Sequence, residues 1–459
     1  MIKILGTIFS IPDLRKKIIF TLSMLLIFRL GAHITVPGVN FHILNEYMKS
    51  ALGNTPGLTD YIDLFAGGAF KRLSVFALGI MPYISASIVM QLLNIVVPSL
   101  ARLQKEGEYG RKKINQYTRY GTVLLCAAQS YGITIYITSL HNEILSKSPN
   151  SMLIESGGGI GFVLLTILTI TTGTIILMWM GEIMTERGIG NGISLLIFGG
   201  IIAGAPPALA TFWNDVQQEQ VEVILALILF VFFVVMIGLS ILLTEGTRKI
   251  PVQYGKRIVG RKMMQGASQS LPIKVNAANV MPIIFASSLM LFPTQIARYL
   301  EGNYQQFSAL IQSFLTPGKI TYILFYVTLI IFFAYFYTAI QYNPKDLAEA
   351  LKKNGGYIPG IRPGQQTEEY IEKVLNRITL SGAIFLAFIA ITPDLIIKLW
   401  SLQKYQSMAH LFGGTSLLII VGVALDTLKQ IESQMVMRHY DGFMDKSSAK
   451  SAKRPRMVR

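Results

Sequence analysis

The chain has 459 residues, of which 52% are hydrophobic and 14% are charged, and its formal net charge is +16. Soluble domains carry about 25% charged residues, so this composition excludes an ordinary soluble protein and predicts a polytopic membrane protein without a large soluble domain. A basic chain can bind nucleic acid, but we favour a simpler origin of the charge, which is the concentration of Lys and Arg on one side of a membrane. The single cysteine excludes an internal disulfide.

Ten apolar segments are predicted to cross the membrane as helices. The polar connections between them alternate in charge. Those on the same side of the membrane as the N-terminus carry most of the 41 Lys and Arg residues. The positive-inside rule then places both chain ends in the cytoplasm. The predicted spans are 18–38, 73–97, 119–140, 158–180, 191–211, 221–243, 277–297, 319–342, 378–400 and 411–430.

A short apolar piece, residues 61–72, precedes the second span; Gly67 and Gly68 interrupt it, and Lys71 and Arg72 close it. Twelve helical residues rise about 18 Å, which is too short for a bilayer core of about 30 Å. A half-length helix that leads into a full span implies irregular backbone at membrane depth. Such backbone is tolerated where it is buried in protein or lines a water-filled cavity. This stretch therefore predicts a plugged pore.

Charged residues in or beside the spans have more than one explanation. Arg29 in the first span either extends to the membrane surface or pairs inside the protein. Glu182, Glu186 and Arg187 lie between the fourth and fifth spans and form either a proton relay or a structural ion pair. Their position in a short cytoplasmic turn favours the ion pair.

Two cytoplasmic segments are long enough to have structure of their own. In 244–274, β-type residues at 250–254 and 257–259 flank a Gly turn and predict a hairpin. In 343–377, an Asn cap and a Gly pair bound a predicted helix at 344–353.

The basic residues of these segments also have two explanations, which remain open. A rigid basic loop can dock an acidic partner or ribosomal RNA, because phosphate contacts need charge and no base reading. Alternatively, the charge reflects only the positive-inside bias. The tail, residues 431–459, is basic and poor in apolar residues, which predicts disorder. The candidate docking residues are Lys256, Arg257, Arg261, Lys262 and Arg362.

Two short sequence matches indicate an internal repeat, although shared membrane-helix composition is an alternative. MPYISAS at 81–87 matches MPIIFAS at 281–287, and GISLLI at 192–197 matches GTSLLI at 414–419. Each match joins spans that lie five apart, so the partners run in opposite directions. This is an inverted-topology repeat of two five-helix halves, which places the functional site at the midplane where the halves meet. The halves are assigned to residues 1–211 and 212–430.

Isoleucines occupy repeat positions at this interface. If four helices present them at one height, they form an apolar ring, and such a constriction can block water and ions by dewetting. Ordinary packing is the alternative role for each residue alone. Pro82 and Pro282 lie inside the matched spans and are expected to loosen their helices. The ring residues are Ile80, Ile84, Ile197, Ile284 and Ile419.

The sequence offers little catalytic chemistry. The five histidines make no metal-ligand spacing, and neither HExxH nor GxxxxGK[ST] occurs. We therefore expect no enzymatic activity, no metal, no cofactor and no ATP-driven work by the chain itself. A secondary transporter would also suit inverted repeats, but it needs polar or charged groups at the midplane, where this chain offers isoleucine.

Seven stretches, which span nearly the whole chain in family order, resemble the SecY family of central subunits of the bacterial protein-conducting channel. They are FRLGAHITVPGVN (28–40), LFAGGAFKRLSVFALGIMPYISASIVMQLL (64–93), GEIMTERGIGNGISLLIF (181–198), RKIPVQYGKRIVGRK (248–262), LPIKVNAANVMPIIFASSLMLFP (271–293), NPKDLAEALKKNGGYIPGIRPG (343–364) and GTSLLIIVGVALDTLKQIE (414–432).

The resemblance implies an all-α membrane protein with ten transmembrane helices in two inverted five-helix halves around a central hourglass pore. A lateral gate is implied where spans 2 and 3 face spans 7 and 8. The implied function is translocation of unfolded, signal-bearing polypeptides across the plasma (inner) membrane, with sideways release of membrane-protein helices into lipid. The resemblance adds Ile193 to the ring and makes residues 61–72 the plug, with Tyr61, Leu64, Phe65, Gly67, Gly68 and Phe70 as its residues.

The resemblance also implies partners and a source of energy. The loops 244–274 and 343–377 match those that bind the SecA motor or the ribosome, and Arg362 matches an arginine that the family uses for motor-driven transport. The family works with the small membrane subunits SecE and SecG. No cofactor is implied, so the energy is expected to come from a partner.

Overall fold

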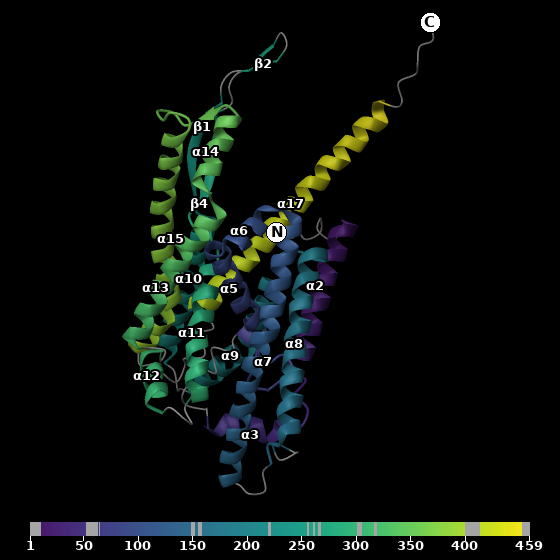
Figure 1. The fold of residues 1–459 in the computed structure, drawn as a ribbon, viewed down its shortest axis with the longest axis vertical. Helices are drawn as coiled ribbons and strands as arrows, with labels where there is room; N and C mark the ends of the chain where they lie inside the picture. Colours follow the sequence, from purple (N-terminus) through teal and green to yellow (C-terminus); the bar gives the residue numbers. More distant parts are fainter. Residues whose placement is uncertain are drawn as a thin grey trace.

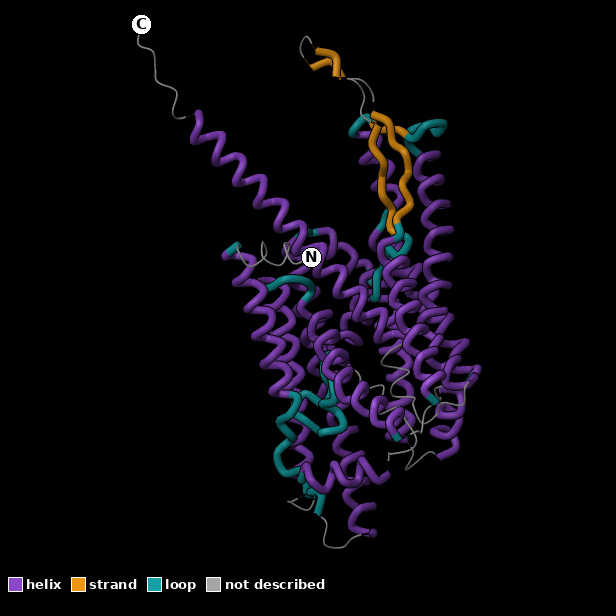
Figure 2. The backbone as a smooth tube through the Cα atoms, turned by 180° about the vertical axis from the view of Figure 1, so that it is seen from behind, coloured by secondary structure: helices purple, strands orange, loops and turns teal. Residues whose placement is uncertain are grey.

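Long helices form the body of the computed structural model, and a slender β unit and the C-terminal helix project from one end of it, here called the charged end (Figures 1 and 2). The structure describes residues 11–51, 63, 65–147, 152–154, 158–218, 222–254, 257–259, 262–264, 268–300, 305–315, 319–399 and 414–451.

The order of elements follows the predicted alternation of spans and connections. The helices are α2 (Pro12–Gly31), α3 (Phe41–Ala51), α5 (Met81–Val96), α6 (Pro98–Lys105), α7 (Glu108–Lys147), α8 (Ile160–Arg187), α9 (Gly192–Gln217), α10 (Val223–Glu245), α11 (Met281–Leu300), α12 (Gln305–Leu315), α13 (Ile320–Gln341), α14 (Pro344–Lys353), α15 (Gln365–Leu399) and α17 (Gly414–Ser451). The strands are β1 (Thr247–Tyr254), β2 (Arg257–Val259), β3 (Lys262–Met264), β4 (Ser268–Lys274) and β5 (Gly356–Tyr357).

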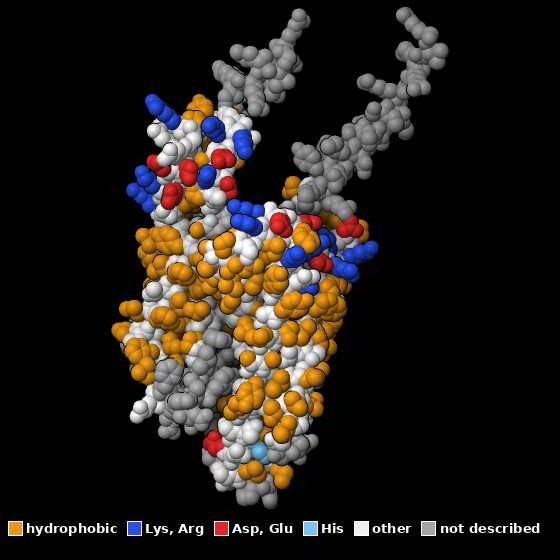
Figure 3. All heavy atoms as spheres, in the orientation of Figure 1, with side chains coloured by type: hydrophobic (Ala, Val, Ile, Leu, Met, Phe, Trp, Pro, Cys, Tyr) orange, Lys and Arg blue, Asp and Glu red, His pale blue; other side chains and the backbone are white. Residues whose placement is uncertain are grey.

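Each of the ten predicted spans overlaps one long helix, namely α2, α5, α7, α8, α9, α10, α11, α13, α15 and α17. By length and composition, seven helices among the described residues qualify as membrane spans, and an eighth qualifies if the bent pair of α5 and α6 is counted as one. Hydrophobic side chains cover the helical body in a broad band, and most charged side chains lie at the charged end (Figure 3). This arrangement confirms the multi-pass helical membrane fold.

The second span begins later than predicted and ends where predicted. Residues 67–80 are turns rather than helix, with positive φ at Leu73 (45°) and Gly79 (55°), so α5 begins at Met81 instead of Leu73. At the other end Val97 precedes a proline and is extended (φ −100°, ψ 110°), as expected at such a position. The chain there bends by 99° into α6.

The expectation that two prolines loosen their helices is wrong. Pro82 lies in the first turn of α5, and Pro282 is likewise the second residue of α11. A proline in the first turn removes no helical hydrogen bond, and its fixed φ favours helix initiation. These residues therefore mark where the two matched helices begin.

The repeat extends to backbone geometry. Gly79 and Asn279 precede their helices by two residues and both have φ of 55°. The next residue in each copy accepts the first helical bond: Ile84 N–H donates to Ile80 O and Ile284 N–H to Val280 O, each at 3.2 Å. In the second match the two glycines are likewise the first residues of α9 and α17, but Gly414 has positive φ (61°) and Gly192 does not. The two inverted halves thus share the local bend before α5 and α11.

The β unit at the charged end is a small layer of its own. β1 pairs antiparallel with β4 from Thr247↔Lys274 to Gln253↔Ser268 and also pairs with β5. The predicted hairpin between 250–254 and 257–259 is therefore wrong: the first segment, in β1, pairs with β4, and the second, β2, pairs with β3. The predicted helix at 344–353 is confirmed as α14, which Asn343 caps by accepting from Lys345 N–H at 3.2 Å. A separate core joins the sheet to α14 and α15, and it contains Ile250, Val252, Ile273, Leu351, Ile358, Ile371 and Leu375.

The C-terminal tail also differs from expectation. α17 continues without a break to Ser451, so the prediction of disorder is wrong over 431–451, while 452–459 lie outside the described residues. The stretch contains three Met and two Lys, which have high helix propensity, and no Pro, which would interrupt a helix.

Candidate functional site

The five isoleucines predicted from the repeat lie in one buried hydrophobic cluster. They come from the N-terminal ends of α5, α9 and α11 and from α17, and each is at most 5% exposed. None of them therefore faces lipid, and both halves contribute to the same apolar core. We call Ile80, Ile84, Ile197, Ile284 and Ile419 the isoleucine set.

Ile193 stands apart from the isoleucine set. It is only partly buried against the same cluster, one turn before Ile197 on α9. It packs against α8, because a Cβ on Gly181 would lie 3.0 Å from Ile193 Cγ1.

Three further residues of the cluster escaped the sequence analysis. Val280 occupies the repeat position that matches Ile80, and Ile201 and Val423 lie one helical turn beyond members of the isoleucine set. All three are at most 8% exposed. A search at i+4 spacing from the matched isoleucines would have found the last two, and a search that accepted any aliphatic residue would have found Val280.

The predicted plug, residues 61–72, lies beside this cluster where the structure describes it. Phe65 and Phe70 are each 5% exposed and belong to the same cluster as the isoleucine set. Gly67 and Gly68 both have positive φ, 67° and 85°, a conformation that glycine adopts readily. Tyr61 and Leu64 lie outside the described residues.

The segment that follows, residues 73–80, is held by backbone hydrogen bonds to the turn after α2. Val36 N–H donates to Leu73 O, and Val75 N–H donates to Ile34 O, both at 2.9 Å. The stacked rings of Phe28 and Phe76, with centroids 6.1 Å apart, add a contact from α2 itself.

Three glycines of the N-terminal half, here called the cradle, let helices approach residues 65–80 closely. A Cβ on Gly31 of α2 would overlap the Phe76 ring, and one on Gly173 of α8 would overlap Val75 O. A Cβ on Gly200 of α9 would lie 3.2 Å from Phe65 O. The irregular segment is therefore seated against α2, α8 and α9.

Arg29, whose pairing the sequence left open, turns inward. Its Nη1 donates a 2.6 Å hydrogen bond to Gly67 O in the predicted plug. The ion pair expected near Glu182 is also present, but its partner is Arg119 of α7, with N–O distances of 3.0 and 2.6 Å. Glu182 lies inside α8 rather than in a turn.

Among the described residues, side-chain hydrogen bonds join the two halves at two places. At one, Ser85 Oγ of α5 lies 3.3 Å from Ser288 Oγ of α11. At the other, Gly190 N–H before α9 donates to Gln430 Oε1 of α17 at 2.8 Å. Within the C-terminal half, Asn279 Nδ2 before α11 donates to Asp426 Oδ2 of α17 at 2.5 Å.

Three of the five predicted docking residues are described, and they lie at the charged end. Arg362 is exposed in the turn between β5 and α15, where its carbonyl oxygen accepts from Thr367 Oγ1 at 2.9 Å. Arg257 and Lys262 lie on the β2–β3 pair, whereas Lys256 and Arg261 lie outside the described residues.

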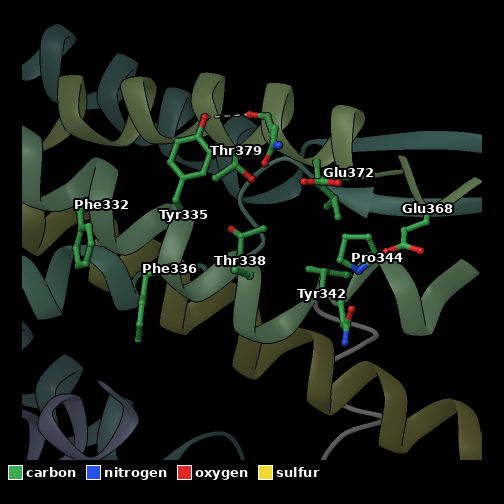
Figure 4. Close-up of a pocket in the computed structure, with 13 residues that line it drawn as sticks. Phe332, Tyr335, Phe336, Thr338, Tyr342, Pro344, Glu368, Glu372 and Thr379 are labelled. Atoms are coloured by element: carbon green, nitrogen blue, oxygen red, sulfur yellow. Dashed lines mark hydrogen bonds between the residues drawn. The ribbon is translucent and has the colours of Figure 1, made fainter. Parts of the chain in front are cut away.

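A cavity of about 570 Å³ lies between α13 and α15, at the base of the β unit (Figure 4). Phe332 and Phe336 line one part, and Glu368 and Glu372 line another. Tyr335 OH donates to Asn376 O at 3.2 Å across its wall. No member of the isoleucine set lines this cavity, and the described residues contain no group of three or more His, Cys, Asp or Glu that could hold a metal ion.

Known proteins resemble the chain over nearly its full length. A family profile described as SecY matches residues 74–428. The protein translocase subunit SecY of Aquifex aeolicus is 43% identical over 445 residues, which cover 97% of this chain and 100% of that relative. The same subunit of Escherichia coli K12 is 41% identical over 442 residues, which cover 96% of each.

Solved structures share the fold. One described as a protein-conducting channel has a TM-score of 0.62 at 18% identity and covers 92% of this chain and 93% of its own. Sec61 in a canine ribosome–channel complex has a TM-score of 0.60 at 17% identity, with the same coverage. The ten-helix inverted fold, the profile match and the identity to full-length relatives agree, and the chain belongs to the SecY family.

Proposed function

We propose that the chain is the pore-forming subunit of a channel that carries unfolded, signal-bearing polypeptides across the plasma (inner) membrane and releases membrane-protein helices sideways into lipid. The main support is the isoleucine set, because side chains from both inverted halves meet in one buried cluster. An apolar constriction of this kind excludes water and ions when empty. Branched side chains can move apart for a passing chain of any sequence.

In this proposal residues 61–72 are the plug that completes the seal. Phe65 and Phe70 lie in the same buried cluster as the isoleucine set, which supports a shared sealing role. A structurally similar SecY, with a TM-score of 0.61 at 18% identity, is described as having a plug domain that stabilises the closed state and maintains a membrane seal.

In this proposal the two halves, residues 1–211 and 212–430, each move as a unit. The lateral gate runs where α5 and α7 face α11 and α13, and Ser85 and Ser288 lie on this line. The charged end faces the cytoplasm, with both termini, because membrane proteins keep Lys and Arg on that side.

The energy comes from a partner, because the chain has no nucleotide-binding motif and acts as a channel rather than an enzyme. The loops at 244–274 and 343–377 dock the SecA motor or the ribosome, and exposed Arg362 supports such a contact. SecE and SecG accompany the chain in the membrane, as the family resemblance implies.

Ion conductance of the empty channel tests the seal. Replacing Ile84, Ile197, Ile284 and Ile419 together with Gly, or deleting residues 61–70, should make the purified channel complex leak ions in planar lipid bilayers. Ile95 and Ile202, which are 58% and 41% exposed on α5 and α9, provide a matched control when replaced with Gly. If neither the fourfold variant nor the deletion raises conductance above this control, the proposed seal is wrong.

Crosslinking tests the path itself. A stalled secretory chain should crosslink to a photoreactive probe at Ile84 and not to one at Ile95, which is exposed on the same helix. Equal crosslinking at both positions would contradict a path through the isoleucine set.

A further inference from the structure

Arg29 is a charged residue placed where a bilayer resists charge. It lies twelve residues beyond Lys17 on α2, which is about 18 Å along the helix axis and within a hydrocarbon core of about 30 Å. A charge at such depth is costly unless it has a partner inside the protein. The structure supplies one, because the cationic Arg29 Nη1 donates a short hydrogen bond to Gly67 O at 2.6 Å, and a charged donor makes such a bond stronger than a neutral one.

The partner of Arg29 lies at a pivot of the chain. Gly67 and Gly68 both have positive φ, which orients the Gly67 carbonyl in a way that few other residues would permit. A Cβ on Gly67 would lie 2.8 Å from Gly200 Cα of α9, so this turn is also wedged against the cradle. Arg29 therefore holds a carbonyl at a point where the backbone changes direction.

Charges of both signs lie near this contact, and the repulsion from Arg72 is larger than the attraction from Asp63. Asp63 attracts Arg29 and Arg72 repels it. Asp63 is itself engaged locally, since its Oδ1 accepts from Lys71 N–H and its carbonyl oxygen accepts from Gly68 N–H, both at 3.0 Å. If residues before Gly67 move away, Arg29 loses its carbonyl partner at membrane depth and still faces Arg72.

The residues on the two sides of the pivot are held differently. Residues 73–80 are fixed by backbone pairing to 34–36 and by the cradle. Toward the N-terminus of Gly67, the described contacts include the packing of Phe65 in the buried cluster, the close approach of Gly200 to Phe65 O and the turn around Asp63. Displacement of the plug from its seat thus requires rotation at Gly67 and Gly68, and Arg29 opposes that rotation.

We propose that Arg29 is a positioning residue that latches the plug in its sealing position through Gly67. This inference rests on the proposed function, because it assumes that residues 61–72 seal the pore. The latch is a contact within the N-terminal half, since α2, α9 and the plug all belong to residues 1–211. Opening of the interface between the halves therefore does not by itself break it, and an incoming chain has to displace it.

Resting conductance in planar bilayers tests the latch. Arg29→Met in the purified channel complex should raise the resting conductance about 10- to 150-fold, the factor that corresponds to loss of one hydrogen bond to a charged group. Arg29→Lys keeps a cationic donor and should restore most of the seal. Arg15→Met removes an exposed arginine from the same helix and should leave the conductance unchanged.

Combination with a plug deletion separates a latch from a general structural role. In a channel that lacks residues 61–70, Arg29→Met should add nothing to the leak, because the latched element is absent. A further increase in that background would overturn the proposal, as would an unchanged conductance for Arg29→Met in the full-length chain. If the deletion leaks while Arg29→Met does not, the latch is wrong and the plug stands; if neither leaks, the seal itself is wrong.

Discussion

A single added methyl group at Gly173 provides a sharp test of how the irregular segment is seated. Gly173 lies within α8, and a Cβ there would overlap Val75 O and lie 2.8 Å from Val75 Cγ1. Val75 has little freedom to retreat, because its N–H is bonded to Ile34 O at 2.9 Å. Gly173→Ala must therefore push residues 73–80 away from α8 or shift the helix itself.

The size of the effect follows from the cost of overpacking. Forcing an extra methyl group into a packed site costs about 1–3 kcal/mol. If this strain is relieved when the segment leaves its seat, the equilibrium between seated and displaced forms shifts by the same free energy. Each 1.4 kcal/mol is a factor of ten, so the displaced fraction, and with it the resting conductance, should rise about 5- to 150-fold.

Gly161→Ala on the same helix is the matched control. A Cβ at Gly161 meets no atom within 4 Å, so the substitution changes helix propensity by up to about 1 kcal/mol without a clash. Single-channel recordings in planar bilayers should show a leak for Gly173→Ala and none for Gly161→Ala. Equal resting conductance of two well-assembled variants would refute the reasoning, because residues 73–80 would then not depend on close contact with α8.

Two further predictions concern the gate and the charged end. Ser85→Cys combined with Ser288→Cys should form a disulfide, because the hydroxyl oxygens are 3.3 Å apart, and should block release of membrane-protein helices until reductant is added; unimpaired release by the oxidised protein would exclude a gate at this line. Arg362→Glu should reduce export of secreted proteins in a vesicle assay while leaving assembly of the complex intact, since the side chain is exposed. Equal loss of export and assembly would instead indicate a folding role.

The overall fold was accessible from the sequence because its determinants are local or periodic. Apolar segments of sufficient length and the sidedness of Lys and Arg predict the ten helices. The repeat motifs predict which helices correspond. The beginning of α5 was missed because residues 73–80 are as apolar as the helix that follows, and composition does not distinguish them. Pro82, read as a helix start signal rather than as an internal disruption, would have placed the boundary.

The seating of the irregular segment could not be derived in the same way. The cradle depends on approaches between residues far apart in the sequence, such as Gly173 with Val75. An isolated glycine in a membrane helix has many explanations and gives no partner. Arg29 is a similar case, because its partner is a backbone carbonyl, and backbone groups leave no mark in a sequence.

Gly79 and Asn279, the residues with positive φ just before α5 and α11, differ in what surrounds them. Gly79 has no side chain, and a Cβ there would lie 3.4 Å from Ala66 Cα. Asn279 has the same φ but extends an amide to Asp426 on α17. The internal symmetry is therefore broken at the gate: α11 is tied by a polar tether to the rest of its half, whereas α5 has no counterpart at Gly79. The start of α11 is therefore anchored to a second helix, and exchange of these two residues would test whether that anchor makes α11 move less than α5.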